Sequence, residues 1–106
     1  NETAALLPAD VSEAEHFSLG LEPSKVVQVP SLTATTVRLE TRLFQHLPLG
    51  ETGHLVLLEV VHFSFADDIL DESNFHIDLD KLNPIARLAG NTYAGLGDQF
   101  ELIRPK

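Results

Sequence analysis

The pattern of apolar and polar positions predicts two long strands in the middle of the chain. Between residues 37 and 47 the two kinds alternate: Val37, Leu39, Thr41, Leu43 and Leu47 share one face, and Arg38, Glu40, Arg42 and His46 share the other. This alternation is typical of a half-buried strand. Residues 54–65, HLVLLEVVHFSF, are apolar on both sides apart from Glu59. Such a strand is expected to be covered on both faces, as in a barrel or the middle of a sandwich.

The segment between the two strands, PLGETG at residues 48–53, has turn composition, so the strands are predicted to form a hairpin. If the turn sets Leu47 opposite His54, Arg42 falls opposite Glu59. An opposite-charge pair across the strands would explain a carboxylate inside an otherwise apolar strand. We therefore interpret Glu59 as a residue that fixes the register.

Shorter elements are predicted before the hairpin. Ser12 followed by Glu15 resembles a capping box, which predicts a helix around Ser12–Leu19 that Gly20 ends. The segment from Pro23 to Ser31 contains the run KVVQV between two prolines, and proline suits an edge or a connector, so this segment is predicted to be extended.

An acidic turn is predicted after the hairpin, at Asp67, Asp68, Asp71 and Glu72. It lacks the alternating acids, central glycine and late glutamate of a calcium-binding EF-hand loop, so we expect it to cap a short helix. The alternating His76, Asp78 and Asp80 are weak evidence for a metal site, and a solvated face is the favoured interpretation.

Two short segments between residues 78 and 90 are each predicted to be a helix or a turn. The first lies around Leu79–Leu82 and is interrupted by Pro84, and the second lies around Ile85–Leu88 and is ended by Gly90.

Composition limits the function more than it defines it. The chain has 106 residues, no cysteine and a formal net charge of −9. Its seven basic residues are scattered, so nucleic acid is not an expected partner, nor is a membrane. The missing cysteines suit a cytoplasmic protein. The absence of methionine, even at position 1, favours a part of a longer chain.

No motif for hydrolase, kinase or dinucleotide chemistry is present: G-x-S-x-G, the P-loop and G-x-G-x-x-G are all missing. His62 lies late in the apolar strand, where a hydrogen-bonded core residue and a ligand contact are both open interpretations. Tyr93, the single tyrosine, lies among Gly90, Gly95 and Gly97. It either lines a pocket or anchors the tail through its hydroxyl.

The order of segments resembles the flavin reductase-like family, the FMN-binding split barrels, and specifically the C-terminal half of their domain. The resemblance rests on the opening NETAALLPADVSEAEHFSLGLEPSKVV, the strand LETRL, the stretch GHLVLLEVVHFSFADDILDE and the closing LNPIARLAGNTYAGLGDQFELIRP. It covers nearly all 106 residues, and the closing motif is its most specific part.

The resemblance implies a mainly β chain with short helices, residues 1–106 forming the C-terminal part of a single Greek-key split barrel. It further implies a homodimer with FMN at the interface and NAD(P)H as the electron donor, hence an oxidoreductase of the flavin reductase type. A non-catalytic FMN-binding or dimerisation module, or a half-barrel that packs against a partner, is the alternative. The residues carried over as cofactor-binding candidates are Tyr93, Asn91, His62, Ser24 and Pro23. No catalytic residue and no metal ligand are predicted, because hydride passes directly between nicotinamide and flavin.

Overall fold

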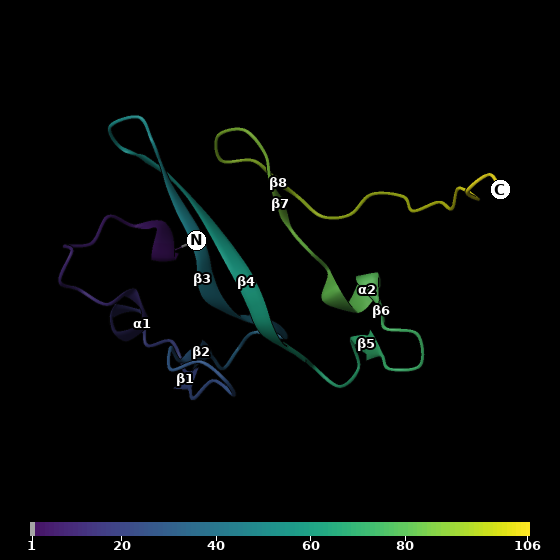
Figure 1. The fold of residues 1–106 in the computed structure, drawn as a ribbon, viewed down its shortest axis with the longest axis horizontal. Coiled ribbons are helices and arrows are strands. Elements are labelled where there is room, and N and C mark those ends of the chain that lie inside the picture. Colours follow the sequence, from purple (N-terminus) through teal and green to yellow (C-terminus); the bar gives the residue numbers. More distant parts are fainter. Residues whose placement is uncertain (1) are drawn as a thin grey trace. The chain divides into compact units, whose positions relative to one another are not determined.

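The computed structural model describes residues 2–106, which divide into two compact units, the first ending at Phe65 and the second covering Ala66–Lys106. The described chain is mainly β, as predicted, and its strands form four antiparallel pairs, β1–β2, β3–β4, β5–β6 and β7–β8 (Figure 1). The elements in chain order are the 3-10 helix η1 (Glu2–Ala4), α1 (Glu13–His16), β1 (Leu21–Glu22), β2 (Ser31–Leu32), β3 (Val37–Leu49), β4 (Gly53–Phe65), β5 (Leu70–Asp71), β6 (His76–Ile77), α2 (Leu79–Leu82), β7 (Ala86–Arg87) and β8 (Tyr93–Ala94).

Helix α1 begins where the sequence predicts but ends early. Ser12 is its N-cap, and the Ser12 hydroxyl accepts a hydrogen bond from the backbone N–H of Glu15 at 3.4 Å. The helix stops at His16 instead of near residue 19, and Ser18 then takes a positive φ of 53°. Gly20 therefore has another role: a Cβ there would lie 2.5 Å from the Thr33 Oγ1, so glycine allows the two segments to approach with the Thr33 side chain where it lies.

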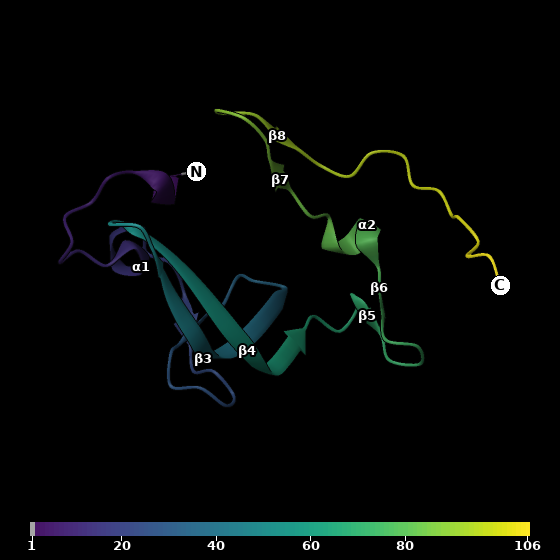
Figure 2. The same ribbon diagram turned by 45° about the horizontal axis from the view of Figure 1, so that its top comes forward.

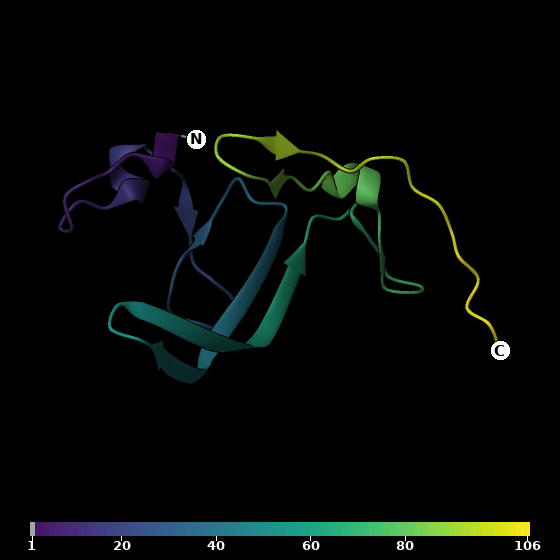
Figure 3. The ribbon, with the colours of Figure 1, turned by 90° about the horizontal axis from the view of Figure 1, so that it is seen from above.

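The predicted hairpin is confirmed and dominates the first unit. Strands β3 and β4 pair antiparallel along their whole length, and the turn between them includes Gly50, whose φ is +66°. Pro48 and Leu49, expected in the turn, continue β3 instead. The hairpin curves strongly along its length (Figure 3).

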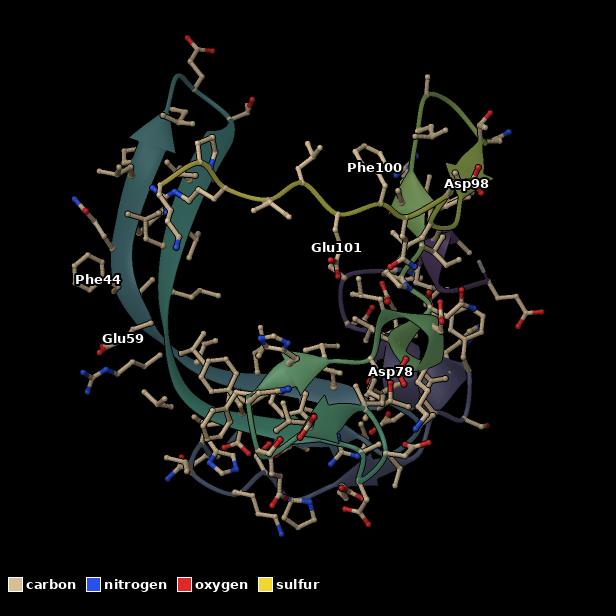
Figure 4. All side chains as sticks on the ribbon, turned by 90° about the vertical axis from the view of Figure 1, so that its right-hand side faces the viewer. Phe44, Glu59, Asp78, Asp98, Phe100 and Glu101 are labelled. Atoms are coloured by element: carbon tan, nitrogen blue, oxygen red, sulfur yellow. The ribbon has the colours of Figure 1, made fainter. Side chains whose placement is uncertain are left out.

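The predicted pairing of Arg42 with Glu59 is confirmed, although the predicted register at the turn is wrong by one residue. Leu47 pairs with Leu55. A β-bulge leaves Phe44 without a partner and takes up the difference, so that Arg42 Nε lies 2.6 Å from Glu59 Oε2. Figure 4 shows Phe44 and Glu59 projecting from the convex side of the hairpin.

Strand β4 is not covered on both faces within the first unit, contrary to the prediction. Six of its large apolar side chains keep exposed fractions between 36% and 57%: Leu55, Val56, Leu57, Leu58, Val60 and Phe63. The reason is that β3 and β4 form a sheet of only two strands, and no second layer lies on it within the first unit. The hairpin therefore presents apolar surface to whatever packs against it.

In the second unit, the acidic turn caps itself and not a helix, which corrects the prediction. The Asp71 carboxylate accepts hydrogen bonds from the Ser73 backbone N–H at 2.9 Å and from its hydroxyl at 2.6 Å. Helix α2 is confirmed at its predicted position, and its N-cap is Asp78, which accepts from the N–H groups of Asp80 and Lys81 at 3.1 Å.

The second helix predicted around residues 85–88 is wrong. Asn83 ends α2 in the left-handed region, with φ of 45°, and the next residues enter strand β7. Pairing of β7 with β8 across a turn at Gly90, φ +60°, satisfies backbone groups that so short a helix would leave open. Beyond β8 the tail runs on without regular structure (Figure 2). Phe100 and Glu101 lie on its opposite sides (Figure 4).

Candidate functional site

The first unit contains a buried carboxylate that gathers three successive backbone N–H groups. Glu40, on β3, is 5% exposed. Its Oε1 accepts from the Lys25 N–H at 2.7 Å, and its Oε2 accepts from the N–H groups of Val26 at 2.6 Å and Val27 at 3.0 Å. The segment between β1 and β2 is therefore a bent loop around a carboxylate, and the extended conformation predicted for it is wrong.

The charge of Glu40 suits this role. Burial by itself raises the pKa of the Glu40 carboxyl. The hydrogen bonds from the N–H groups of Lys25, Val26 and Val27, together with the charge interaction with His62, lower the pKa by more than burial raises it. The net result is a pKa below the ordinary value of 4.5. The carboxylate is ionised at neutral pH, and the three hydrogen bonds are charge-assisted.

Ser24 closes the same loop from within. The Ser24 hydroxyl donates to the Val29 carbonyl at 2.5 Å and lies 2.7 Å from the Ser31 hydroxyl. A hydroxyl has one proton, so Ser31 must be the donor of the second bond. Towards a ligand, Ser24 as it lies here is thus an acceptor only.

A cavity of about 180 Å³ lies beside this loop. Its lining combines hydroxyls, a carboxylate and small apolar groups: Ser24, Val27, Val29, Pro30, Ser31, Leu39, Glu40 and Thr41. No basic side chain contributes to the lining, so this cavity suits a neutral, hydrogen-bonding group better than a phosphate.

A further set of bonds ties the β1–β2 region to β3. Arg38 forms an ion pair with Glu22. The Arg38 Nε donates to the Thr35 hydroxyl at 3.0 Å, and the Arg38 Nη2 donates to the Thr33 carbonyl at 3.2 Å. The loop wall of the cavity is therefore attached to the hairpin on both sides of its bend.

Glu40 is the residue that sequence reasoning missed. Alternation places it correctly on the polar face of the strand, but that face is not solvated at this position, because the loop covers it. The partners of Glu40 are backbone N–H groups, which leave no mark in residue types. The available signal was the run LETRL, quoted for the family resemblance, which contains this glutamate.

Of the predicted site residues in the first unit, His62 lies nearest to this chemistry. It pairs with Glu40 across the β3–β4 ladder and is partly buried. Ser24 lines the cavity, whereas Pro23, its neighbour in the chain, is not among the lining residues. His62 and Ser24 thus both neighbour Glu40, His62 across the strand ladder and Ser24 in the lining of the same cavity.

Tyr93 and Asn91 belong to the second unit, in and next to the β7–β8 hairpin. Tyr93 pairs with Arg87 in the ladder and is 53% exposed, and Asn91 lies in the exposed turn. No hydrogen bond of the Tyr93 hydroxyl is found among residues 2–106, so the described hydrogen bonds do not support the interpretation that Tyr93 anchors the tail. Their joint contribution to a flavin pocket stays a prediction.

The second unit has a cavity of its own, of about 350 Å³, lined by Asp68, Ile69, Leu70, Asp71, His76, Ile77, Asp78 and Lys81. Hydrogen bonds from the Ser73 hydroxyl and N–H, helped by Asn74 and His76, hold the pKa of Asp71 below its ordinary value against the effect of burial. Within residues 2–106 no group of three or more histidine and carboxylate side chains is placed to hold a metal ion. No helix of that range is long and apolar enough to cross a membrane.

The chain is similar to known proteins in sequence and in structure. No family model matches the chain. The chain is 41% identical over 110 residues to the uncharacterized protein YwrF of Bacillus subtilis, and 38% identical over 110 residues to an uncharacterized protein of Halalkalibacterium halodurans. Each match covers 99% of this chain but only 54% and 52% of those proteins. The chain spans about half the length of the curated relatives it matches.

Solved structures give the fold. Nitrilotriacetate monooxygenase component B of Bacillus cereus matches with a TM-score of 0.87 and 40% identity, over 95% of this chain and 52% of that one. The 2-nitrobenzoate 2-nitroreductase of Pseudomonas fluorescens matches with 0.82 and 28%, over 92% and 50%. A Shewanella frigidimarina protein with a split barrel domain, assigned as a flavin reductase, matches with 0.81 over 99% and 52%, and at 23% identity it shows the fold alone.

The chain is thus a mainly β fragment that matches split-barrel flavin reductase structures over about half of their length. The resemblance inferred from the sequence is confirmed to that extent, and the chain is related to nitrilotriacetate monooxygenase component B.

Proposed function

We propose that this chain is the C-terminal part of an FMN-binding flavoprotein that passes electrons from NAD(P)H to flavin. The observation that carries the proposal is the match to nitrilotriacetate monooxygenase component B, at 40% identity and a TM-score of 0.87 over 95% of the chain. In this proposal the complete protein is a cytoplasmic homodimer, and FMN lies where the two barrels meet.

The apolar hairpin supports a flavin site. An isoalloxazine ring requires an apolar, partly closed slot with a few polar groups that set its orientation and electronics. Strands β3 and β4 offer a curved apolar surface that their own unit leaves exposed. That surface is suited to form one wall of the slot.

The roles of the candidate residues follow from their hydrogen-bonding capacity. Ser24, already a donor to Val29, accepts a hydrogen bond from a hydroxyl or amide of the ligand. His62 and Asn91 orient polar edges, and Tyr93 contacts a ring through its face. Pro23 shapes the backbone beside Ser24. No acid or base of this chain is needed, because hydride transfers directly between the two cofactors.

The test is oxidation of NADH and NADPH by the full-length protein, followed by absorbance with and without added FMN. The proposal predicts turnover that depends on flavin and falls when Tyr93 is replaced by alanine. A matched control is Glu51→Ala, in the exposed hairpin turn. Turnover that is absent with FMN present, under conditions where the protein is folded, contradicts the reductase.

A second candidate function is a non-catalytic module that packs against a partner and binds or merely encloses flavin. It is favoured by the near absence of a core: among the described residues, Ile69, at 2% exposed, is the one buried hydrophobic residue. Bound flavin without turnover would support this candidate, and turnover would exclude it.

A further inference from the structure

We infer that Glu40 is a positioning residue: it holds the loop of residues 23–30, and with it Ser24, as a fixed wall of the cavity. The inference rests on the proposed function, because it assigns this wall to the flavin and nicotinamide pocket.

The first argument is that the backbone N–H groups of Lys25, Val26 and Val27 have no backbone partner in the described part of the chain. Among the described residues, no backbone–backbone hydrogen bond involves residues 23–30 outside the neighbouring strands. Backbone groups must nevertheless be satisfied when they leave water. The Glu40 carboxylate supplies that satisfaction for Lys25, Val26 and Val27 at 2.6–3.0 Å.

The second argument is that the anchor is specific to a carboxylate. Two oxygens with about four lone-pair sites accept three N–H groups at once, and the negative charge strengthens each bond. A glutamine has one acceptor oxygen, and its amide nitrogen would face N–H groups that also donate. Replacing Glu40 by glutamine therefore opens the loop without a large change in volume.

The third argument is the position of the loop. Ser24, Val27, Val29 and Pro30 all line the 180 Å³ cavity, and so does Glu40 itself. If the loop opens, the cavity loses one wall and the Ser24 acceptor loses its fixed place. Glu40 thus acts on a ligand through the loop and not by contact alone.

The experiment compares wild type, Glu40→Gln and Glu40→Asp in the full-length protein, with Glu59→Gln as the matched control. Glu59 lies on the same hairpin and also loses one negative charge, but it is exposed and pairs with Arg42 outside the loop. Three readouts are taken: amide hydrogen exchange at residues 25–27 without flavin, the dissociation constant for FMN, and KM for flavin against kcat.

For Glu40→Gln we expect the exchange protection at residues 25–27 to fall about 10-fold or more, as loss of charge-assisted hydrogen bonds implies. The FMN dissociation constant and the flavin KM should rise about 10-fold, with kcat changed less than about 2-fold. Glu40→Asp should recover part of the protection and of the affinity. Glu59→Gln should match wild type in all three readouts.

Three results would overturn the inference: unprotected amides at residues 25–27 in wild type, protection in Glu40→Gln equal to that of the control, or an opened loop with unchanged flavin affinity. If Glu40→Gln does not fold, the wild-type exchange rates still decide whether the anchor exists. Absence of flavin binding by wild type contradicts the proposed function alone, and the exchange rates then confirm or overturn the anchor independently.

Discussion

Different interactions stabilise the inside of each of the two units. In the first, polar bonds join residues far apart in sequence: Glu40 accepts from the backbone of residues 25–27, and Arg38 pairs with Glu22. These bonds attach the β1–β2 loop to the hairpin. They give the first unit a defined polar site although its apolar side chains stay largely exposed.

In the second unit most side-chain hydrogen bonds are local, as between Asp71 and Ser73 or Asp78 and Asp80. The longer-range ones are exposed: Lys81 Nζ donates to the Asp68 carbonyl at 3.0 Å, and Gln99 Nε2 donates to Asp80 Oδ1 at 3.5 Å. Its tail exposes large apolar side chains almost completely, with exposed fractions from 80% to 95% at Phe100, Leu102 and Ile103. Ile69, 2% exposed, is the buried apolar side chain among the described residues of this unit.

The two units therefore depend on different interactions for their local structure. The first unit positions its site by polar anchors that need no partner. The second unit has turns that are locally stable, but the place of its tail depends on apolar surface that another layer must provide.

The largest effect is expected from breaking the second unit at its apolar contact. Ile69→Ala removes a buried side chain and should lower the free energy of unfolding by about 2–5 kcal/mol, and Ile69→Val by about 0.5–1.5 kcal/mol. Denaturant unfolding of the full-length protein measures both. Equal, small effects of the two substitutions would show that Ile69 does not hold the unit.

The next largest effect is expected from acid pH, which protonates Glu40 and so weakens its hydrogen bonds to the loop of residues 23–30. The pKa of Glu40 in the folded protein lies below 4.5, the ordinary value expected in the unfolded chain. The carboxylate therefore contributes its full stabilisation above that ordinary value and loses it as the pH falls through the folded pKa.

The measurement is the free energy of unfolding of wild type and Glu40→Gln from neutral to acid pH. Asp71, whose pKa is also lowered, is present in both proteins, so their difference isolates Glu40. We expect the wild-type advantage to shrink below about pH 4.5. An advantage that grows on acidification has the wrong sign for this account.

A smaller effect is expected at the close approach of Gly20 to Thr33 in the first unit. Gly20→Ala places a Cβ about 2.5 Å from the Thr33 Oγ1 and should cost about 1–3 kcal/mol through overpacking. Thr33→Ala in the same protein removes the clashing atom and should restore most of the loss. Thermal unfolding of the single and double variants tests this, and strict additivity would mean that the two residues do not meet.

The smallest effect is expected at the exposed charge pair of the hairpin. Exchanging the charges one at a time, with Arg42→Glu or Glu59→Arg, should lower the melting temperature by at most a few degrees, and the double exchange should recover it. The hydrogen bond to Glu59, which also raises the pKa of Arg42, is solvent-exposed and screened by salt. A large, salt-independent effect would assign the pair a role beyond register.

The hairpin is predictable from the sequence because strand periodicity and turn composition are local signals. The pairing of Arg42 with Glu59 is predictable too, since a charge in an apolar strand needs a partner. The compensating bulge at Phe44 is not, because its residue type gives no sign of an unpaired position. Strand β7 is mistaken for a helix because its pairing with β8 across a short hairpin outweighs the propensity of its own residues.

The candidate site is only partly predictable. Ser24 and His62 are found through the family resemblance, whereas the anchor between them depends on backbone N–H groups that any residue type supplies. Burial of β4 within the first unit is wrongly predicted, because the apolar pattern reports the surface that a strand can bury and not whether its own unit supplies a covering layer.

The most direct test of the central claim is the visible absorbance of the full-length protein, purified and then mixed with FMN and separated from the excess. The account predicts flavin bands that stay with the protein, one FMN per subunit, and that leave it on denaturation. A folded protein that retains no flavin at saturating FMN would contradict the account.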